Sequence, residues 1–429
     1  MAERKTNKKT QRAVKKAAKK AAKKYPILVF IAFLLVVVIV GCILLHRKGV
    51  IHLPFLDSLL PQQSQQSSES SSSSSSSSGE EGEMQGVPSV DYTSTQFSSE
   101  EVTQIKGSAL SIHFLELGNK YTGDSALIKV GDTEILIDAG SRQNSAGTIV
   151  PYVQQFCEDN VLEYVIATHA HQDHIAGFIG TANATGVFES FECETIIDFP
   201  RTNNDESKTN SVYGKYKAKR DAEVEAGATH YTALECWNNE NGAQRSYSLG
   251  SGVTMHILYQ KFYEEKASDE NDYSVCVLLT EGENNYLFTG DLEHSGEESL
   301  VQSNDLPQCV LYKGGHHGSP TSSTEALLEK IQPEMVCVCC CCGSDEYTEN
   351  VENIFPSQAF IDRIAPYTDK VYVTTIIAKN EGGYTSLNGN IVVTSNNGAL
   401  TVLCSNNTTL FKDTEWFKYN RTCPEAWAS

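Results

Sequence analysis

The chain has 429 residues, of which 40% are hydrophobic, so it is long enough for one large or two ordinary domains. Its formal net charge is −20, but the charge is unevenly spread, because 13 of the 34 Lys/Arg and only one acidic residue fall in residues 1–48. The rest of the chain therefore has a formal charge of −32. Such a charge argues against binding to nucleic acid by bulk electrostatics, which needs a basic surface.

The N-terminal segment predicts a membrane anchor. Residues 1–25 form a basic tail, and residues 26–45, PILVFIAFLLVVVIVGCILL, carry no charge. A helix of that length spans about 30 Å, the thickness of the hydrocarbon layer. No small-residue cleavage site follows, which favours a retained anchor over a signal peptide. Because basic flanks stay in the cytoplasm, we expect a single-pass protein of the cell membrane, with a cytoplasmic N-terminus and an extracellular C-terminal domain.

Residues 46–106 predict a flexible linker, because the run PQQSQQSSESSSSSSSSSGEEGEMQG and its flanks hold few large apolar side chains. From residue 107 short apolar runs alternate with turns, which predicts one layered α/β domain over residues 107–429. Strands are expected, in chain order, at residues 109–117, 124–131, 133–140, 162–169, 253–259, 273–282, 285–293, 308–315, 334–342, 369–376 and 390–403. Helices are expected at residues 147–160, 294–303, 323–331 and 356–364.

The stretch IATHAHQDHI, residues 166–175, follows one of these apolar runs and holds three of the chain's 11 histidines. On a loop after a strand, His169 and His171 are two residues apart, whereas Asp173 and His174 are adjacent. This spacing lets the first pair of side chains face one metal ion and the second pair face a neighbouring ion. Imidazole and carboxylate ligands suit Zn²⁺, Mn²⁺ or Fe²⁺ and leave positions open for water. The stretch therefore predicts a metal site.

The same residues resemble the His-x-His-x-Asp-His signature of the metallo-β-lactamase superfamily. Further landmarks follow in the expected order: Asp138 in EILIDAG, Asp291 in YLFTGDLE, and His316 and His317 in YKGGHHGS. The runs FLELGNKYTGDSALIKVGDTEILIDAG and LYKGGHHGSPTSS look most like the hydrolase domain of ComEC-like competence proteins. The resemblance covers most of the chain after the linker and implies an αββα four-layer sandwich.

The resemblance also implies two divalent metal ions, zinc or manganese, and a set of ligands. One ion would be held by His169, His171 and either Asn271 or Asp272, and the other by Asp173, His174 and His316. Asp291 would bridge the two ions, and Asp138 would steady the metal-binding loop. The place where the superfamily usually supplies a further histidine reads ENDYSVCVLL here, and an oxygen ligand at that place would favour manganese.

Asp173 and His317 are the expected catalytic residues. His317 would sit over the substrate as an acid or electrostatic stabiliser, or would replace His316 as the ligand. A pair of metal ions can activate water and neutralise a phosphoryl oxygen, so hydrolysis of a phosphodiester is the expected reaction. The resemblance makes DNA the expected substrate. Two alternatives stay open: another phosphodiester of the cell envelope, such as a choline-phosphate or teichoic-acid ester, and a non-catalytic, metal-stabilised binding module.

Two further runs are unusual. Residues 201–220 hold six Lys/Arg in an otherwise acidic domain, and either form a phosphate-gripping flap, with Arg201 and Lys208 as candidate substrate contacts, or a solvated loop and helix. The run Cys337–Cys342 lacks the paired spacing of a zinc site and favours a buried strand. The sequence does not predict an oligomeric state.

Overall fold

The computed structural model describes residues 95–378 and 383–428. The predicted basic tail, the predicted membrane helix at residues 26–45 and most of the predicted linker lie outside the described residues. Within residues 95–378 and 383–428, no helix is both long enough and apolar enough to cross a membrane.

Folded structure begins inside the segment predicted to be linker, so the predicted end of the linker at residue 106 is wrong. Helix α4 (Ser99–Lys106) starts at a capping box, in which the Ser98 side chain accepts from the Glu101 N–H and the Glu101 carboxylate accepts from the Ser98 N–H. Phe97 and Ile105 are buried. The sequence missed this helix because two apolar residues are too few to show a helical period.

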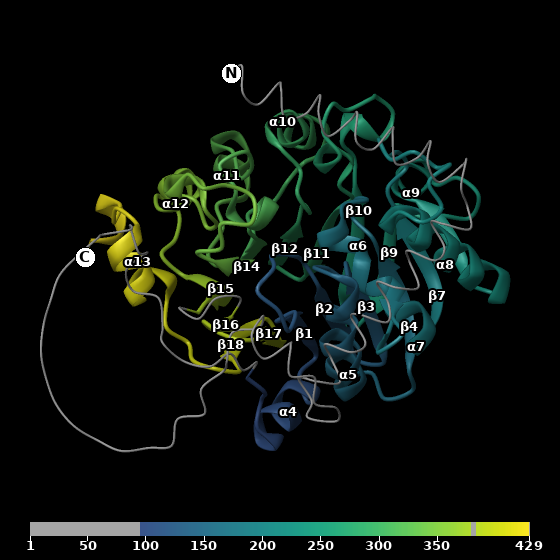
Figure 1. Ribbon diagram of the computed structural model, residues 1–429, viewed down its shortest axis with the longest axis horizontal. Helices are drawn as coiled ribbons and strands as arrows, with labels where there is room; N and C mark the ends of the chain where they lie inside the picture. Colours follow the sequence, from purple (N-terminus) through teal and green to yellow (C-terminus); the bar gives the residue numbers. More distant parts are fainter. Residues whose placement is uncertain (1–94, 379–382, 429) are drawn as a thin grey trace, which may run out of the picture. The chain divides into compact units, whose positions relative to one another are not determined.

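Two eight-stranded mixed sheets form the centre of the domain (Figure 1). The first has the order β18-β17-β1-β2-β3-β4-β7-β8 and the second the order β16-β15-β14-β13-β12-β11-β10-β9. The strands of the first sheet are β1 (Leu110–Phe114), β2 (Ala126–Val130), β3 (Thr133–Ile137), β4 (Val161–Ile166), β7 (Glu192–Asp198), β8 (Thr229–Thr232), β17 (Ile391–Asn396) and β18 (Ala399–Cys404). Those of the second are β9 (Ser246–Gly250), β10 (Val253–Leu258), β11 (Cys276–Glu281), β12 (Asn284–Phe288), β13 (Leu311–Lys313), β14 (Val336–Cys342), β15 (Val371–Ile377) and β16 (Tyr384–Ser386). A small hairpin joins β5 (Gly180–Thr181) to β6 (Ala184–Thr185).

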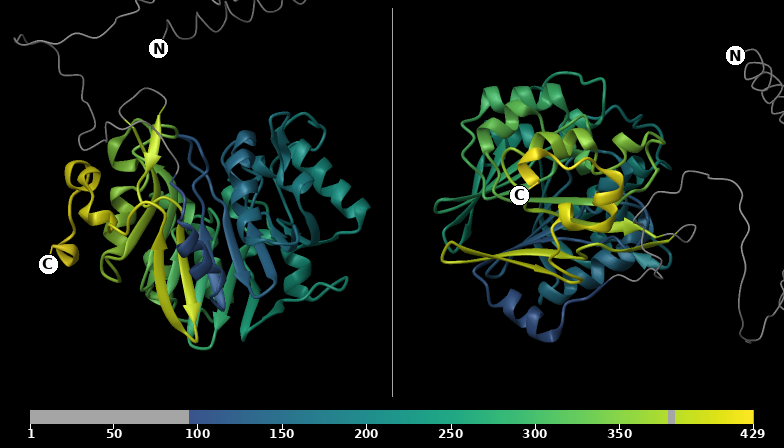
Figure 2. Two further views of the ribbon diagram at one scale, coloured as in Figure 1. Left: turned by 90° about the horizontal axis from the view of Figure 1, so that it is seen from below. Right: turned by 90° about the vertical axis from the view of Figure 1, so that its left-hand side faces the viewer.

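Helices cover the outer faces of both sheets (Figure 2). Beside the first sheet lie α5 (Ala146–Phe156), α6 (Gln172–Ile179), α7 (Val187–Ser190) and α8 (Val212–Ala226), whose apolar residues join the larger core cluster, and α9 (Ala233–Asn238) follows β8. The outer face of the second sheet packs against α10 (His294–Ser303), α11 (Glu325–Ile331), α12 (Gln358–Ile364) and α13 (Glu415–Asn420), which form the second cluster. The expected αββα sandwich is confirmed.

The central strands are almost entirely buried because both of their faces are covered. All seven residues of β14 are buried, so the run Cys337–Cys342 is a core strand, as the sequence indicates. Parallel pairing joins β3 to β4 and β12 to β13 to β14. Since the carboxyl ends of parallel strands meet at one edge of a sheet, the segments after β3 and β4 are neighbours in the first sheet and those after β12 and β13 are neighbours in the second. These four segments carry residues of the candidate site.

Candidate metal centre

The segment after β4 presents two imidazoles to one point. His169 Nε2 and His171 Nδ1 lie 3.0 Å apart, and the two ring centroids are separated by 4.8 Å. Two nitrogens bound to one tetrahedral zinc at about 2.0 to 2.1 Å would lie about 3.3 Å apart, which matches the arrangement of these rings. Behind His169, its Nδ1 is 3.4 Å from the Ser274 hydroxyl. His169 and His171 are therefore oriented to share one cation.

His174 is held by Asp138, as the sequence predicts for that carboxylate. The Asp138 Oδ2 is 2.7 Å from His174 Nδ1, and Asp138 also accepts from the Thr168 N–H and hydroxyl, both at 2.7 Å. Because a carboxylate only accepts, His174 donates from Nδ1 to Asp138, and its Nε2 faces Asp291 Oδ2, 3.0 Å away. A carboxylate behind a histidine in this way fixes the ring and strengthens it as a metal ligand.

The α6 N-terminus places Asp173 and His174 differently from the predicted loop. His171 is the N-cap residue and α6 starts at Gln172, so both residues lie in the first turn. The backbone of this turn is clamped by Gly140: the Asp124 N–H donates to the Asp173 carbonyl at 3.0 Å, and a Cβ on Gly140 would lie only 1.5 Å from that carbonyl oxygen. Only glycine allows this approach.

The two adjacent histidines, between which the sequence left the ligand position open, are placed differently. His317 is buried, donates from Nδ1 to the Cys339 carbonyl at 2.9 Å, and directs Nε2 to Asp291 Oδ2 at 3.1 Å and Asp173 Oδ2 at 3.5 Å. His316 Nε2 is farther from Asp291, at 3.9 Å, and its ring lines a cavity. The geometry therefore favours the alternative that the sequence left open, with His317 directed at the carboxylates of the cluster and His316 facing the cavity.

The turn that carries these histidines explains why sequence alone did not separate them. His316 has φ = 44° and His317 has φ = 55°, both in the left-handed region that side chains with a Cβ rarely adopt. Two consecutive left-handed residues send the second ring inward, beside Cys339 of β14, and leave the first at the rim. The turn is held by the His316 N–H, which donates to the Gly290 carbonyl at 3.1 Å, and by the Ser322 hydroxyl, which donates to the Gly315 carbonyl.

Two buried residues of the cluster were missed by sequence reasoning, Asp124 and Lys313. Asp124 Oδ1 is 3.1 Å from His317 Nδ1, and its other oxygen forms an ion pair with the Lys313 ammonium. The Lys313 ammonium also lies 3.8 Å from Asp291 Oδ1. A lysine as the last residue of a buried strand, three residues before a ligand-type histidine, was the available signal, because lysines are rarely fully buried without a partner.

The electrostatics of the cluster are those of a cation site. Burial opposes charge on Asp291, yet His174 and His317 hold its pKa well below the usual value. Burial likewise opposes charge on the two histidines, but the Asp291 carboxylate outweighs it and raises the pKa of His174 and of His317 well above the usual value. Each imidazole nitrogen that faces Asp291 is a place where a proton or a metal ion can sit.

The donor set fits divalent metal ions. Ligand atoms of Asp124, His174, Asp291 and His317 lie within 4.8 Å of one another. His317 Nε2 and Asp291 Oδ1 are among several buried polar atoms of the described residues that lack a hydrogen-bond partner. Buried polar atoms are normally satisfied, so these two atoms fit the role of metal ligands. His/carboxylate sets of this kind bind Zn²⁺ and also suit other transition metals such as Mn²⁺.

Asn271 and Asp272, the two alternatives predicted for one ligand, are placed differently. Asn271 lines the cavity and donates to Glu293 Oε1 at 3.3 Å. Asp272 instead turns toward α10, where it accepts from the Glu293 N–H at 3.3 Å, and burial raises its pKa to about 6. Of the two alternatives, only Asn271 is positioned beside the cluster, and the nearby Asp269 also lines the cavity.

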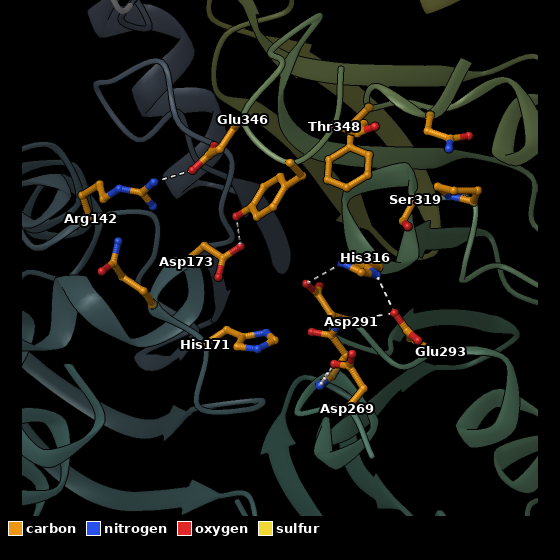
Figure 3. Close-up of a pocket in the computed structure, with 16 residues that line it drawn as sticks. Arg142, His171, Asp173, Asp269, Asp291, Glu293, His316, Ser319, Glu346 and Thr348 are labelled. Atoms are coloured by element: carbon orange, nitrogen blue, oxygen red, sulfur yellow. Dashed lines mark hydrogen bonds and ion pairs between the residues drawn. The ribbon is translucent and has the colours of Figure 1, made fainter. Parts of the chain in front are cut away.

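A cavity of about 660 Å³ opens over the cluster (Figure 3). The Tyr347 hydroxyl donates to Asp173 Oδ2 at 2.6 Å, and Arg142 is ion-paired with Glu346. The lining residues are Arg142, His171, Gln172, Asp173, Asp269, Asn271, Asp291, Glu293, His316, Ser319, Pro320, Glu346, Tyr347, Thr348, Asn353 and Phe355. The loop of Glu346 and Tyr347 has no motif, so sequence reasoning could not assign it.

The two predicted substrate residues are not in this cavity. Arg201 lines a separate cavity of about 430 Å³, and Lys208 lines neither of the two cavities and lies 3.9 Å from Asp205 Oδ2. Residues 201–211 form a loop and α8 follows, as in the solvated alternative that the sequence left open.

Comparisons with known proteins agree with this site. Residues 118–187, which include Asp124, Asp138 and the His169–His174 stretch, match the Metallo-beta-lactamase superfamily. The chain is 42% identical over 216 residues to Competence protein ComA of Neisseria gonorrhoeae, covering 49% of this chain and 25% of that protein. It is 27% identical over 220 residues to Recombination protein 2 of Haemophilus influenzae, covering 50% of this chain and 23% of that protein.

The match thus spans about a quarter of the length of these curated relatives. Among solved structures, the metallo-beta-lactamase fold protein YhfI from Bacillus subtilis aligns with a TM-score of 0.35 and 12% identity, over 64% of this chain and 98% of that protein. The predicted resemblance to the metallo-β-lactamase superfamily, and within it to competence proteins, is confirmed by the sequence matches.

Proposed function

We propose, starting from the metallo-β-lactamase superfamily match and the similarity to competence proteins, that this chain is a metal-dependent phosphodiesterase that hydrolyses DNA. One observation carries the proposal. The Nε2 atoms of His174 and His317 converge on Asp291 Oδ2 at 3.0 and 3.1 Å, while Asp138 and the Cys339 carbonyl fix the opposite side of each ring. Both rings are thus fixed with Nε2 facing Asp291, and the cavity opens above them.

The residues divide into two groups of ligands and one bridging position. His169 and His171 would hold one ion, and Asp173, His174 and His317 would hold the other, with Asp291 between the groups. Divalent ions at this place would supply a water nucleophile at neutral pH and neutralise charge on a phosphoryl oxygen. Zinc and manganese are both compatible with these ligands.

His316 is the candidate proton donor to the leaving oxygen. Its Nδ1 is 3.0 Å from the Thr321 hydroxyl and 3.4 Å from Glu293 Oε1, which orients the ring and leaves Nε2 on the cavity side. A positioned acid contributes about 10²- to 10⁴-fold to the rate of such reactions. Tyr347, which donates to Asp173, would position that carboxylate.

We also propose that residues 26–45 anchor the protein in the cell membrane and that the domain acts outside the cell. The distribution of basic residues around the apolar segment supports this orientation. An alkaline phosphatase or green fluorescent protein fusion after residue 429 tests it: phosphatase activity is expected, and fluorescence without phosphatase activity would place the domain in the cytoplasm.

A smaller phosphodiester is the second candidate substrate, and one feature of the cavity favours it. The rings of Tyr347 and Phe355 lie with their centroids 5.6 Å apart and their planes tilted by 33°, and Asp269, Glu293 and Glu346 line the same space. Aromatic faces beside acidic groups suit a cationic headgroup such as that of a choline-phosphate ester.

A substrate panel tests the proposal. The full-length chain, loaded with Zn²⁺ or Mn²⁺ and analysed for metal content, would be given single-stranded DNA, bis-p-nitrophenyl phosphate and a choline-phosphate ester. DNA cleavage that is lost in Asp291→Asn supports the nuclease assignment. Exclusive turnover of the choline ester would favour the second candidate, and metal binding without turnover of any phosphodiester would favour the binding module.

A further inference from the structure

A second cavity, of about 430 Å³, lies outside the metal centre and carries uncompensated positive charge. Its lining comes from the residue 199–206 segment, from α8 and from Lys266 and Tyr273. Arg201 and Lys266 are exposed, and within the described residues neither has a carboxylate partner. The chain after residue 48 has a formal charge of −32, so two unpaired cations at one cavity are unusual there.

The other charges of this cavity are neutralised. Arg220 forms ion pairs with Asp198 and Asp221, both at 2.7 Å, and Glu206 is paired with Lys217 at 2.8 Å. The side chains of Arg201 and Lys266 are therefore the ones left to meet a ligand, and that ligand must be an anion.

One short loop separates this cavity from the metal cavity. Lys266 and Tyr273 line the second cavity, whereas Asp269 and Asn271, between them in the chain, line the first, where Figure 3 labels Asp269. Asn271 lies five positions after Lys266 in the chain, so their backbones are at most about 18 Å apart. At about 3.4 Å per nucleotide of stacked strand, five or so nucleotides cover that distance.

The loop is tied down against the neighbouring segment, so it forms a fixed wall. The Asn203 N–H donates to Glu270 Oε2 at 2.7 Å, and the Tyr273 hydroxyl donates to Asn203 Oδ1 at 3.3 Å and accepts from the Ala267 N–H at 3.0 Å. A ligand that reaches both cavities must pass over this wall, and a small ester held in the metal cavity would not extend so far.

We infer that the second cavity binds a backbone phosphate of a single-stranded nucleic acid whose scissile phosphate lies in the metal cavity. Arg201 and Lys266 supply the two phosphate contacts. This inference rests on the proposed function, because it assigns the polymeric substrate to the same enzyme. It also explains how an acidic domain engages a polyanion: the contacts are local, beside the metal centre, rather than spread over the surface.

The first test compares substrates of two sizes. The full-length Arg201→Ala/Lys266→Ala variant should have a KM for a single-stranded octanucleotide about tenfold higher than that of the unmodified chain, with an unchanged rate on bis-p-nitrophenyl phosphate. Lys208→Ala is the matched control, since it removes an exposed cation of the same segment from outside the cavity, and it should leave both activities unchanged. An equal loss on both substrates, or an equal effect of Lys208→Ala, would overturn the inference.

The second test measures binding without turnover. A fluorescent octanucleotide with phosphorothioate linkages would be titrated with each protein at several salt concentrations, and its anisotropy recorded. Removing two phosphate contacts should lower the slope of log K against log salt by about 1.4, since each contact to a single strand contributes about 0.7. Unchanged affinity and slope, or no binding by the unmodified chain, would refute the inference. Binding that meets the expectation, without cleavage of any phosphodiester, would refute the proposed function and leave the phosphate site standing.

Discussion

The metal centre has two walls, one formed by residues of the first sheet and the other by residues of the second, and they are built in different ways. The first sheet contributes residues that are close in sequence, from His169 to His174, with Asp138 behind them. The second sheet contributes Asp291, which follows β12, Lys313 at the end of β13, and His317, which depends on an unusual turn after β13. The first wall can be predicted from the sequence because its residues lie in one short motif, from His169 to His174. The second wall cannot, because it depends on backbone conformation and on a buried ion pair.

Asp291 connects the two walls, so its removal should have the largest effect. Asp291→Asn keeps the size of the side chain and removes the charge that faces His174 and His317. We expect phosphodiesterase activity to fall by about 10³-fold or more, because metal ions supply several kcal/mol of transition-state stabilisation. Metal content measured by plasma mass spectrometry should fall in parallel, and chelation should reduce the unmodified chain to the same level. Full metal content in the variant would contradict the bridging position.

Lys313→Met tests whether the second wall depends on its ion pair. The variant leaves the buried Asp124 carboxylate without its lysine partner, and breaking a buried pair from one side costs about 3 to 5 kcal/mol of folding free energy. Denaturant unfolding of the full-length chain measures the loss. Asp124→Asn/Lys313→Met should recover much of it, because neither charge then remains alone. Equal stability of the single and double variants would argue against the pair.

His316 and His317 lie in one turn of the second wall, but we expect their substitutions to have different effects. His317→Ala should lose metal, whereas His316→Ala should keep metal and lose about 10²-fold in kcat, the range expected for a general acid. The two variants are matched controls for each other, since they change neighbouring residues of one turn. Metal loss in His316→Ala with retention in His317→Ala would restore the assignment made from sequence.

Asp138→Asn should give the smallest effect, on the first wall. The change keeps the contact to Thr168 but weakens the hold on His174 Nδ1, and such changes behind a ligand reduce metal affinity by about 10- to 100-fold. Competition with a chromogenic chelator measures the affinity. Affinity equal to that of the unmodified chain would mean that the α6 turn alone orients His174.

The sequence predicted much of the fold because its signals are local. The expected strands and helices of the domain are present, and the α10 bounds, His294–Ser303, agree with the prediction. The site was predicted as a set of residues, but not the division between His316 and His317, which depends on two left-handed residues. Asp124 and Tyr347 could be assigned to the site only from the tertiary structure, because neither belongs to a recognisable motif. The same holds for the finding that Arg201 lines a cavity and Lys208 does not.

The cysteine-rich strand β14 has a practical consequence for chemical labelling of the domain. Burial raises the pKa of its thiols, so they stay protonated. Oxidants attack thiolates, so these buried thiols should react slowly. Of the twelve cysteines in the described residues, all are free and Cys423 alone is exposed. A maleimide dye should therefore mark the native domain at one position, and each additional adduct will report that the interior has opened.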